Sequence, residues 1–465
     1  MSKSKSVSVA AVDMGATSGR VFVAKWDGEH LEMSESHRFR HSFASLGSHC
    51  YWEMGALYRE ITDGLRLARE AEPKLASCGL DFWGVDHALL LKDGRLAHPI
   101  YSYRDERTRL LMPDRESEEA AELYARTGIP PVVYNSSIQL KETLSAMPAL
   151  RDSVERCLFL PDYVNYLLSG AKENEVSIAS TSQLLSLDGG GFDAETLNRM
   201  GIPQDWFSEP SKCGKVLGSV ESEKGLEGLS VSLVPGHDTS CAFEGAPGAT
   251  EDDFVVSTGT WVLAGAFSDK PFPTELGLQK GISHERCGDG GLRPTKILLG
   301  LWMVERLFDS FGVHPQSQQD WSSLLHNVEV EPVPGEVLDT GDSSLFNPSD
   351  MREAIDAQLK SRGLPLPASL AAYLRLVYES IAESVAAALK EFESALGRRY
   401  PRIVLIGGGA KNELLCRSLN ERSGCPVYAY PTEAAVIGNA AYQLKALGAI
   451  DSVSEFRKGL AKQFD

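Results

Sequence analysis

The chain has 465 residues, too many for one ordinary hydrophobic core, so we expect two domains. Its 64 acidic and 46 basic side chains give a net charge of −18, which argues against binding to nucleic acid or to an anionic membrane. The sequence has no apolar run of membrane-spanning length and no secretory signal, and its eight cysteines are scattered without metal-ligand spacing. We therefore expect a globular cytoplasmic protein with reduced thiols; the sequence makes no prediction of its oligomeric state.

The first predicted element lies in residues 7–20, which read VSVAAVDMGATSGR. Small and β-branched residues predict a buried strand that reaches Asp13, and a turn rich in Gly, Thr and Ser leads into a second strand up to Trp26. Such a turn can direct several backbone N–H groups and hydroxyls at one phosphate oxyanion. Because Asp13 would repel a bare anion, the pattern also favours a divalent cation between the carboxylate and the phosphate. An ordinary β-hairpin, in which Asp and Gly only permit the turn, is the alternative.

Helices and strands alternate through the rest of the first half. Apolar residues at helical spacing predict a helix over residues 52–72. Residues 75–100 predict two strands with a polar turn between them and a hairpin after the second. A helical region follows around residues 117–150, and Pro161 with Asp162 indicates the start of a further helix.

The second half opens with the same pattern as the first. Residues 244–253 are small, acidic and interrupted by Gly and Pro, so we place the domain boundary there and expect domains at 1–244 and 245–465. Residues 254–267 then repeat the order of apolar strand, Ser/Thr/Gly turn and apolar strand. Two lobes built this way would each offer one phosphate-binding turn.

Two more elements are predicted near the end of the chain. Apolar residues form one helical stripe from Leu370 to Leu396, and Gly397 ends that helix. A buried strand at 403–406 then leads into GGGAKN at 407–412 and another helix. Three consecutive glycines allow a phosphate or a flat ligand to approach the backbone closely, whereas the alternative, a plain β–α turn, needs only one.

Two polar turns offer groups for chemistry on a hydroxyl. GHDT at 236–239 follows a strand and carries Asp238, a carboxylate suited to act as a general base; an Asx-turn is the alternative. WGVDH at 83–87 combines Trp83, a flat apolar wall, with Asp86, a hydrogen-bond acceptor. Sugar-binding sites use this pairing, although a core tryptophan beside a capping aspartate gives the same pattern.

Together these motifs resemble the FGGY family of carbohydrate kinases, members of the actin-like ATPase superfamily, and within it the rhamnulokinase branch most closely. The segments that carry the resemblance occur in family order over nearly the whole chain: AVDMGATSGRV (11–21), DFWGVDHALL (81–90), YSYRDERT (101–108), LPDYVNYLLSG (160–170), ASTSQLL (179–185), PGHDTSCA (235–242), STGTW (257–261), LLGLWMVERL (298–307) and IGGGAKNELL (406–415). The resemblance implies an α/β fold of two ribonuclease H-like lobes around a central cleft. It also implies ATP and Mg²⁺ as cofactors and a small-molecule ketose as substrate.

The resemblance further implies roles for individual residues. Asp238 would be the base that takes the proton from the ketose hydroxyl, and Asp13 and Asp238 would hold Mg²⁺. The residues that would contact the sugar are Gly84, Asp86, His237, Asp238 and Thr239. The residues that would contact the nucleotide are Ala16, Thr17, Ser18, Gly19 and Arg20 in the first lobe, and Thr260, Gly408, Gly409 and Asn412 in the second.

Three residues depart from the rhamnulokinase pattern. His87 stands where Phe or Tyr forms one wall of the sugar pocket, Ile297 replaces an Asn that contacts ligand, and Glu305 replaces a Gln near the nucleotide. A site that hydrogen-bonds a particular hydroxyl can discriminate between sugars by roughly 10⁴ or more, so such exchanges can redirect specificity.

We therefore expect ATP-dependent phosphorylation of a ketose, with L-rhamnulose converted to L-rhamnulose 1-phosphate as the leading hypothesis. A different ketose, such as L-fuculose or xylulose, is the first alternative, and His87 and Ile297 favour it. A nucleotide- and sugar-binding sensor without catalysis is the second. A dinucleotide-binding oxidoreductase is disfavoured because no GxGxxG motif follows a predicted strand.

Overall fold

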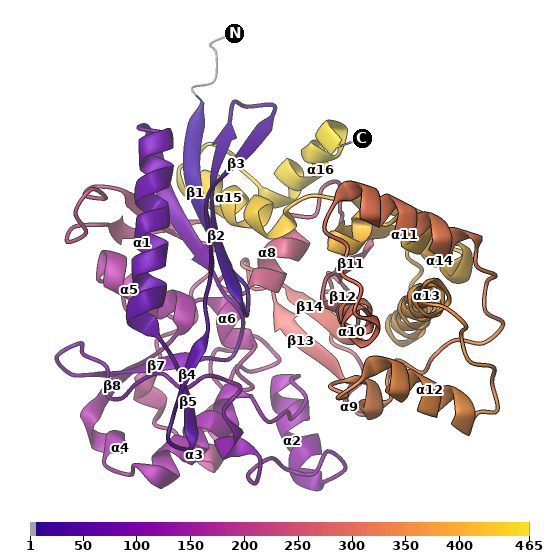
Figure 1. Cartoon of the computed structure of the whole chain (residues 1–465). Helices are drawn as coiled ribbons and strands as arrows, with labels where there is room; N and C mark the ends of the chain where they lie inside the picture. Colours follow the sequence, from indigo (N-terminus) through magenta and orange to yellow (C-terminus); the bar gives the residue numbers. More distant parts are fainter. Residues whose placement is uncertain (1–5, 465) are drawn as a thin grey trace. The chain divides into compact units, whose positions relative to one another are not determined.

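The computed structural model describes residues 6–464 and divides into two compact units (Figure 1). Unit 1 contains the chain up to Thr250, Ser268–Pro294 and the chain from Glu433 onward. Unit 2 contains Glu251–Phe267 and Thr295–Thr432. The chain therefore leaves unit 1 and returns to it twice. The sequence places a sugar-binding lobe before residue 245 and a nucleotide-binding lobe after it, and it does not anticipate the two returns of the chain to unit 1. This division stays a prediction.

The main sheet of unit 1 has the strand order β3-β2-β1-β6-β10-β9. The first three strands pair antiparallel, β6 joins β1 in parallel and β10 joins β6 in parallel. The strands of this sheet are β1 (Val7–Met14), β2 (Ser18–Trp26), β3 (Leu31–Arg40), β6 (Leu75–Asp81), β9 (Lys215–Ser219) and β10 (Ser230–Leu233). The two strands predicted for the opening stretch are confirmed as β1 and β2.

Two helices cover opposite faces of this sheet, α1 (Met54–Ala71) and α15 (Ala434–Ala446) (Figure 1). Alternate side chains of a strand point to opposite faces, and in β1 both sets are buried. Ala10 and Val12 belong to the core that includes α1, whereas Val9 belongs to the core that includes α15. Such two-sided burial is the environment that the unbroken apolar run of β1 requires.

Unit 1 also contains smaller elements. Its other strands are β4 (Phe43–Leu46), β5 (His49–Trp52), β7 (His87–Leu91), β8 (Val154–Phe159) and β13 (Ile282–Arg286). Its other helices are α2 (Glu118–Thr127), α3 (Ser136–Ala146), α4 (Leu150–Ser153), α5 (Leu160–Ser169), α6 (Val176–Ser180), α7 (Ala194–Met200), α8 (Asp238–Glu244), α9 (Thr274–Lys280) and α16 (Val453–Phe464), with 3₁₀ turns η1 (Glu106–Thr108) and η2 (Gln204–Trp206).

The sheet of unit 2 has the order β14-β12-β11-β15-β16, and β13 of unit 1 adjoins the start of β14. Again three antiparallel strands are followed by two parallel ones. Its strands are β11 (Phe254–Thr258), β12 (Trp261–Ala266), β14 (Leu292–Leu299), β15 (Ile403–Gly407) and β16 (Val427–Tyr430). Since both units share one strand order and one pattern of directions, the predicted pair of ribonuclease H-like folds is confirmed.

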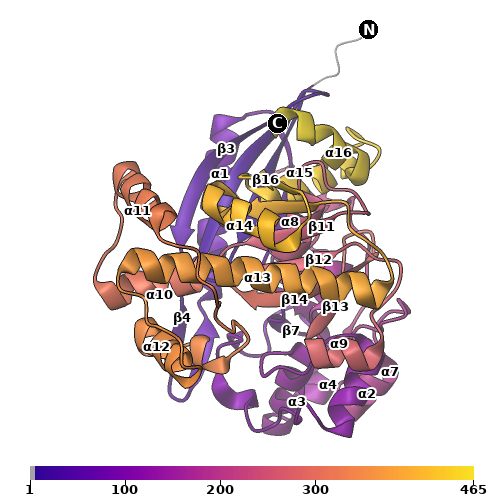
Figure 2. The same cartoon turned by 90° about the vertical axis from the view of Figure 1, so that its right-hand side faces the viewer.

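The helices of unit 2 pack around α13 (Leu370–Leu396), the long helix that the sequence predicts (Figure 2). Ser369 caps its first turn, and Gly397 ends it with a positive φ of 64°. The other helices are α10 (Trp302–Phe311), α11 (Gln318–Val330), α12 (Met351–Ser361) and α14 (Glu413–Ser423), with 3₁₀ turns η3 (Ser343–Leu345) and η4 (Gly408–Lys411).

The chain folds back at Asp93–Gly94, as the sequence predicts: Leu91 N donates to Arg95 O, Ala97 N donates to Leu89 O, and Leu90 and Leu96 form an antiparallel bridge. The strand after WGVDH, β7, also pairs with β8 along its length. One local prediction needs correction, because Asp238 is the first residue of helix α8 and not part of a turn.

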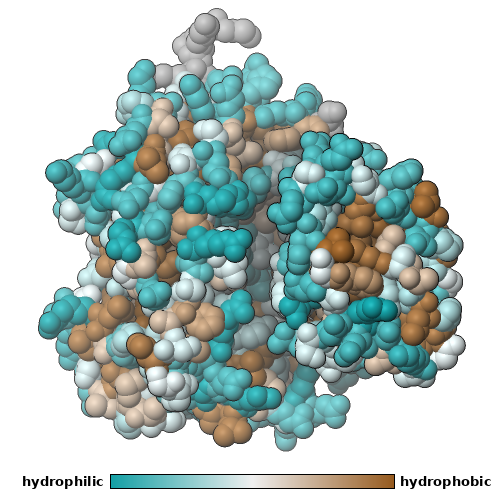
Figure 3. Space-filling model, viewed as in Figure 1, coloured by the Kyte–Doolittle hydropathy of each residue, from teal (hydrophilic) through white to brown (hydrophobic). Residues whose placement is uncertain are grey.

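On the face drawn in Figure 3, hydrophilic side chains cover much of the surface, with patches of apolar side chains among them. Within residues 6–464, none of the helices combines the length and the apolar character that crossing a membrane requires.

Helices α8 and α15 cross with their backbones in contact. A Cβ atom added at Gly438 would lie 2.0 Å from the carbonyl oxygen of Cys241, and one added at Gly245 would lie 2.0 Å from that of Ala434. Only glycine permits this approach, because any side chain would occupy the space of a neighbouring backbone. The crossing fixes the helix that begins with Asp238.

We expect Gly438→Ala to separate α8 from α15 and to lower the free energy of unfolding by about 2–3 kcal/mol, because overpacking strains the backbone. Urea unfolding measures this loss. Gly459→Ala is the matched control, since Gly459 lies in α16 with open space around it and alanine favours a helix. Equal stability of the two variants would contradict the close crossing.

Candidate functional site

The predicted phosphate turn joins β1 to β2 in unit 1. Its ends are tied by a 3.0 Å hydrogen bond from Gly15 N to Ser18 O, and Thr17 is exposed. The imidazole Nε2 of His41 lies 2.8 Å from Gly15 O, and His41 N donates to Thr17 O. The turn is thus held by carbonyl contacts from outside, which leaves Ala16, Thr17 and Ser18 at the surface for a ligand.

Arg20 lies next to this turn but points back toward carboxylates. Its guanidinium donates to Asp13 directly across the β1–β2 pair and to Glu433 Oε2 at 2.6 Å. Burial works against its charge, yet the two carboxylates raise the pKa of Arg20 above its usual value. Arg20 therefore neutralises part of an acidic cluster, in addition to its predicted contact with phosphate.

That acidic cluster, which we call the carboxylate edge, consists of Asp13, Asp81 and Asp238. Asp13 and Asp81 are register partners at the ends of the parallel strands β1 and β6, and Asp238 N donates to the carbonyl oxygen of Phe82, the residue directly after β6, at 2.9 Å. Burial, with the nearby charge of Asp13, raises the pKa of Asp81 well above its usual value. Asn439 donates to Asp81 Oδ2 at 2.7 Å, whereas Asp81 Oδ1 has no hydrogen-bond partner among residues 6–464.

The carboxylate edge fits a divalent cation. All its side-chain donors are carboxylate oxygens, which Mg²⁺ prefers, and Arg20 offsets only part of their charge. The unpartnered oxygen of Asp81 is a further sign that a positive group is accommodated here. Asp13 and Asp238, the predicted metal ligands, are both part of this edge.

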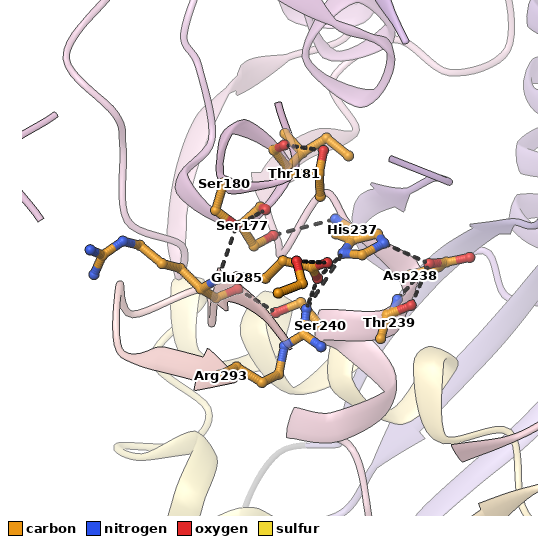
Figure 4. A network of polar contacts seen from close by, with 12 residues as sticks. Ser177, Ser180, Thr181, His237, Asp238, Thr239, Ser240, Glu285 and Arg293 are labelled. Carbon is orange, nitrogen blue, oxygen red and sulfur yellow. Dashed lines mark hydrogen bonds and ion pairs between the residues drawn. The ribbon is translucent and has the colours of Figure 1, made fainter. Parts of the chain in front are cut away.

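The carboxylate of Asp238 is held from one side (Figure 4). Its Oδ1 accepts hydrogen bonds from Thr239 N at 2.5 Å and from Thr239 Oγ1 at 3.1 Å, and it lies 3.4 Å from His237 Nε2. Its Oδ2 accepts no hydrogen bond within the described part of the chain, and the side chain is 30% exposed. Burial raises the pKa of Asp238; His237 opposes this shift and the charge of Asp13 adds to it.

The other predicted sugar-binding turn runs from Gly84 to Asp86 between β6 and β7. Val85 has a φ of 72°, a strained value for a β-branched residue. Thr181 Oγ1 accepts from Val85 N at 3.1 Å and Ser136 Oγ donates to Val85 O at 2.5 Å, so neighbouring elements hold the strained backbone in place. Strain of this kind is typical of functional sites, where the surrounding structure maintains it.

Asp86 is almost completely buried and holds two tryptophan side chains. Its Oδ2 accepts from the indole Nε1 of Trp52 at 2.6 Å and from that of Trp83 at 2.9 Å, and the two rings lie 4.5 Å apart. The structure thus places Asp86 behind the aromatic wall that the sequence predicts. Burial raises the pKa of Asp86 to about 6, against the hydrogen bonds from Trp83 and Trp52.

Two histidines complete this region. His41 stacks on Trp83 at 5.1 Å while it contacts Gly15 O, so it connects the phosphate turn with the aromatic wall. His87 is buried at the start of β7, and burial together with the charge of Arg107 lowers the pKa of His87 to about 3, which leaves it neutral.

The predicted nucleotide contacts of unit 2 lie on two neighbouring turns. Thr260 is exposed between β11 and β12, and its carbonyl accepts from Trp302 N at the start of α10. The glycine turn after β15 packs on the same strand, because a Cβ atom at Gly409 would lie 2.6 Å from Thr258 Oγ1. Gly408 is exposed beside it, and Asn412 caps α14 through its side-chain oxygen.

The structure places each predicted residue within its own unit. In unit 1 it brings together Asp13, Asp238, His237 and Thr239, and in unit 2 Thr260, Gly408, Gly409 and Asn412. Ile297 and Glu305, the departures in the second half, are both exposed in unit 2.

Four polar residues at the site were not singled out from the sequence: His41, Asp81, Glu285 and Arg293. For Asp81 a signal existed, since it follows an apolar strand as Asp13 does. Glu285 and Arg293 lie in a charged stretch that offers no local pattern.

We expect the unfolding free energy of the wild type to contain a component from Asp86 that falls as pH rises from about 4 to about 6. The pKa of Asp86 is raised on folding, so in this window the folded state holds a proton that the unfolded state releases. Asp86→Asn keeps an acceptor oxygen and removes the component, on the order of 2 kcal/mol. Urea unfolding at pH 4 and pH 7 measures it, and an identical pH dependence in both proteins would contradict it.

Comparison with known proteins identifies the family of this chain and several relatives. The N-terminal domain of the FGGY family of carbohydrate kinases matches residues 8–243, and the C-terminal domain of the same family matches residues 254–447. A rhamnulokinase of Pectobacterium carotovorum is 34% identical over 459 residues, 98% of this chain and 91% of the relative. A rhamnulokinase of Mannheimia succiniciproducens is 32% identical over 461 residues, 98% of this chain and 94% of the relative.

Solved structures share the fold at lower identity. Glycerol kinase of Plasmodium falciparum, crystallised with ADP, has a TM-score of 0.80 at 15% identity and covers 98% of this chain and 92% of its own. Xylulose kinase of Rhodospirillum rubrum has a TM-score of 0.76 at 14% identity, with the same coverage. With both family domains matched along nearly its whole length, the chain belongs to the FGGY family of carbohydrate kinases and is a sugar kinase that uses ATP and Mg²⁺.

Proposed function

We propose that this kinase phosphorylates a ketose at the terminal hydroxyl next to the carbonyl, with L-rhamnulose as the leading substrate and Asp238 as the general base. Two relatives named rhamnulokinase, 32% and 34% identical over 98% of the chain, support the substrate. The observation that carries the base is the asymmetry of the Asp238 carboxylate: Thr239 holds Oδ1, and Oδ2 is open to a ligand.

In this proposal the sugar hydroxyl hydrogen-bonds to Asp238 Oδ2 and gives up its proton there. The hydroxyl oxygen forms a bond to the γ-phosphorus as the bond from that phosphorus to ADP breaks, so ADP leaves with the bridging oxygen. Burial raises the pKa of Asp238, which brings its proton affinity closer to that of a useful base near neutral pH.

Besides a base, phosphoryl transfer requires that the reactants are aligned and that the charge of the phosphate oxygens is neutralised. Asp13 and Asp238 would hold Mg²⁺, which supplies positive charge to the phosphate oxygens. The backbone from Ala16 to Gly19 and the hydroxyls of Thr17 and Ser18 would bind phosphate in unit 1, as would Arg20. In unit 2, Thr260 would bind phosphate, and Gly408, Gly409 and Asn412 would border the nucleotide.

The sugar would lie against Gly84, His237 and Thr239, with Asp86 acting behind the aromatic wall. Because Asp86 uses the indole N–H groups of Trp52 and Trp83, these rings can present only apolar surface to a ligand, which suits the C–H face of a sugar. A different ketose, such as L-fuculose or xylulose, is the second candidate, because the buried neutral His87 and the exposed Ile297 depart from the rhamnulokinase pattern.

We expect Asp238→Asn to fold as the wild type does and to lose about 10²-fold or more in kcat, because the amide cannot accept the proton. A coupled assay of ADP release measures kcat, and thermal unfolding checks the fold. Asp205→Asn is the control, since Asp205 is an exposed aspartate on η2. Wild-type turnover in Asp238→Asn would refute the assignment of the base.

The same assay with L-rhamnulose, L-fuculose and xylulose tests the substrate. We expect the highest kcat/KM for L-rhamnulose. A preference of tenfold or more for another ketose would reject L-rhamnulose in favour of that sugar, and phosphorus NMR of the product identifies the phosphorylated carbon.

A further inference from the structure

We propose that Glu285 is a positioning residue for phosphoryl transfer, which orients His237 and, through it, the carboxylate of Asp238. The inference rests on the proposed role of Asp238 as the base. It assigns a function to a residue of the β13–β14 hairpin, some fifty positions beyond the GHDT motif in the chain.

The contacts form a continuous chain of polar groups within unit 1 (Figure 4). Arg293 Nη2 donates to Glu285 Oε2 at 2.5 Å, and the same Oε2 lies 3.1 Å from His237 Nδ1. On the other side of the imidazole, Nε2 lies 3.4 Å from Asp238 Oδ1. Each ring nitrogen of His237 thus faces one carboxylate.

The shorter of these contacts fixes the tautomer of His237. A carboxylate oxygen can only accept a hydrogen bond, so a 3.1 Å contact is favourable when Nδ1 carries the proton and repulsive when it carries a lone pair. Arg293 Nη2 is 3.5 Å from the same nitrogen, a longer contact. Glu285 therefore keeps a proton on Nδ1 and directs Nε2 toward Asp238 and the open oxygen beside it.

Burial makes this arrangement rigid. The side chain of Arg293 is 0% exposed, that of Glu285 9% and that of His237 11%. Burial alone would favour the neutral form of Glu285, but His237 and Arg293 lower the pKa of Glu285 to about 2, so it is ionised throughout the working range. Ser283 Oγ donates to its other oxygen at 3.1 Å, which leaves Oε2 for Arg293 and His237.

In the catalytic triads of hydrolases, a buried acid orients a histidine in the same way. Loss of that acid allows the wrong tautomer and lowers turnover steeply. Here the oriented imidazole lies against the carboxylate and not against a nucleophile. Its effect is to fix the edge of the imidazole beside Asp238 Oδ1, which the N–H and the hydroxyl of Thr239 hold, so that Oδ2 faces the substrate.

Glu285→Gln tests this role. We expect kcat to fall by about 10- to 100-fold, because the amide can present N–H to Nδ1 and release the tautomer, while the KM for ATP stays within about twofold. Asp253→Asn is the matched control, since it breaks a buried carboxylate–arginine pair with Arg402 in unit 2; we expect its kcat to stay within about twofold of the wild type. Wild-type kcat in Glu285→Gln would overturn the proposal.

A double-mutant cycle separates positioning from general support of the fold. If Glu285 acts through His237, adding Glu285→Gln to His237→Asn should change kcat by less than about twofold. A full loss in that background would show that Glu285 acts by another route and overturn the proposal. Loss of turnover in Asp238→Asn alongside wild-type turnover in Glu285→Gln rejects only the positioning role, whereas wild-type turnover in Asp238→Asn rejects the base itself.

A spectrum of the wild type tests the tautomer of His237 directly. Proton–nitrogen correlation spectra of the histidine rings should show a proton on Nδ1 of His237, identified by the signal that His237→Asn removes. A ring that carries its only proton on Nε2 would overturn the proposal.

Discussion

Parallel pairing of β1 with β6 places Asp13 beside Asp81, and the hydrogen bond from Asp238 N to Phe82 O brings a third carboxylate to the same edge. Three acids in one place repel one another and resist burial, so the surroundings must offset their charge. Arg20 pairs with Asp13, Asn439 donates to Asp81, and the backbone and hydroxyl of Thr239 hold Asp238. Because the carboxylates are buried, solvent screens their remaining negative charge poorly. A divalent cation binds under this condition.

Precision at this edge comes from contacts that leave no room for adjustment. Helix α8 crosses α15 at glycines, so the first residue of α8 cannot move without shifting backbone against backbone. At the predicted sugar-binding turn, Thr181 and Ser136 hold Val85 in a strained conformation, and Asp86 fixes two indole rings through hydrogen bonds. The groups that we propose to react are therefore placed by elements that are themselves fixed, which is what catalysis by alignment requires.

Much of this could be predicted from local pattern. Strands β1 and β11, helix α13 and the glycine turn after β15 follow from periodicity and turn chemistry, because those signals lie within a dozen residues of one another. Asp13 and Asp238 could be named because each follows a strand in a recognisable motif. The pairing of β7 with β8 could not, since their ranges are more than sixty residues apart and hydropathy does not specify the partner of a strand.

The residues that were missed are those whose partners are distant in sequence. Glu285 becomes meaningful only when the β13–β14 hairpin lies beside the start of α8, and His41 only when β3 ends beside the β1–β2 turn. Asp86 was recognised, but its buried place behind Trp52 and Trp83 depends on tertiary packing that composition does not reveal. A polar side chain acquires its role from its neighbours, and sequence separation hides those neighbours.

The return of the chain to unit 1 from Glu433 onward has a consequence for biosynthesis. Glu433, Gly438 and Asn439, which contact Arg20, Cys241 and Asp81, leave the ribosome only after all of unit 2 has been made. A growing polypeptide can form the sheet of unit 1 early, but it lacks the helix that packs against α8 and the amide that satisfies Asp81. The proposed phosphate-transfer site can therefore assemble only after α15 has been synthesised, and a product terminated before α15 lacks two of the contacts that hold the carboxylate edge.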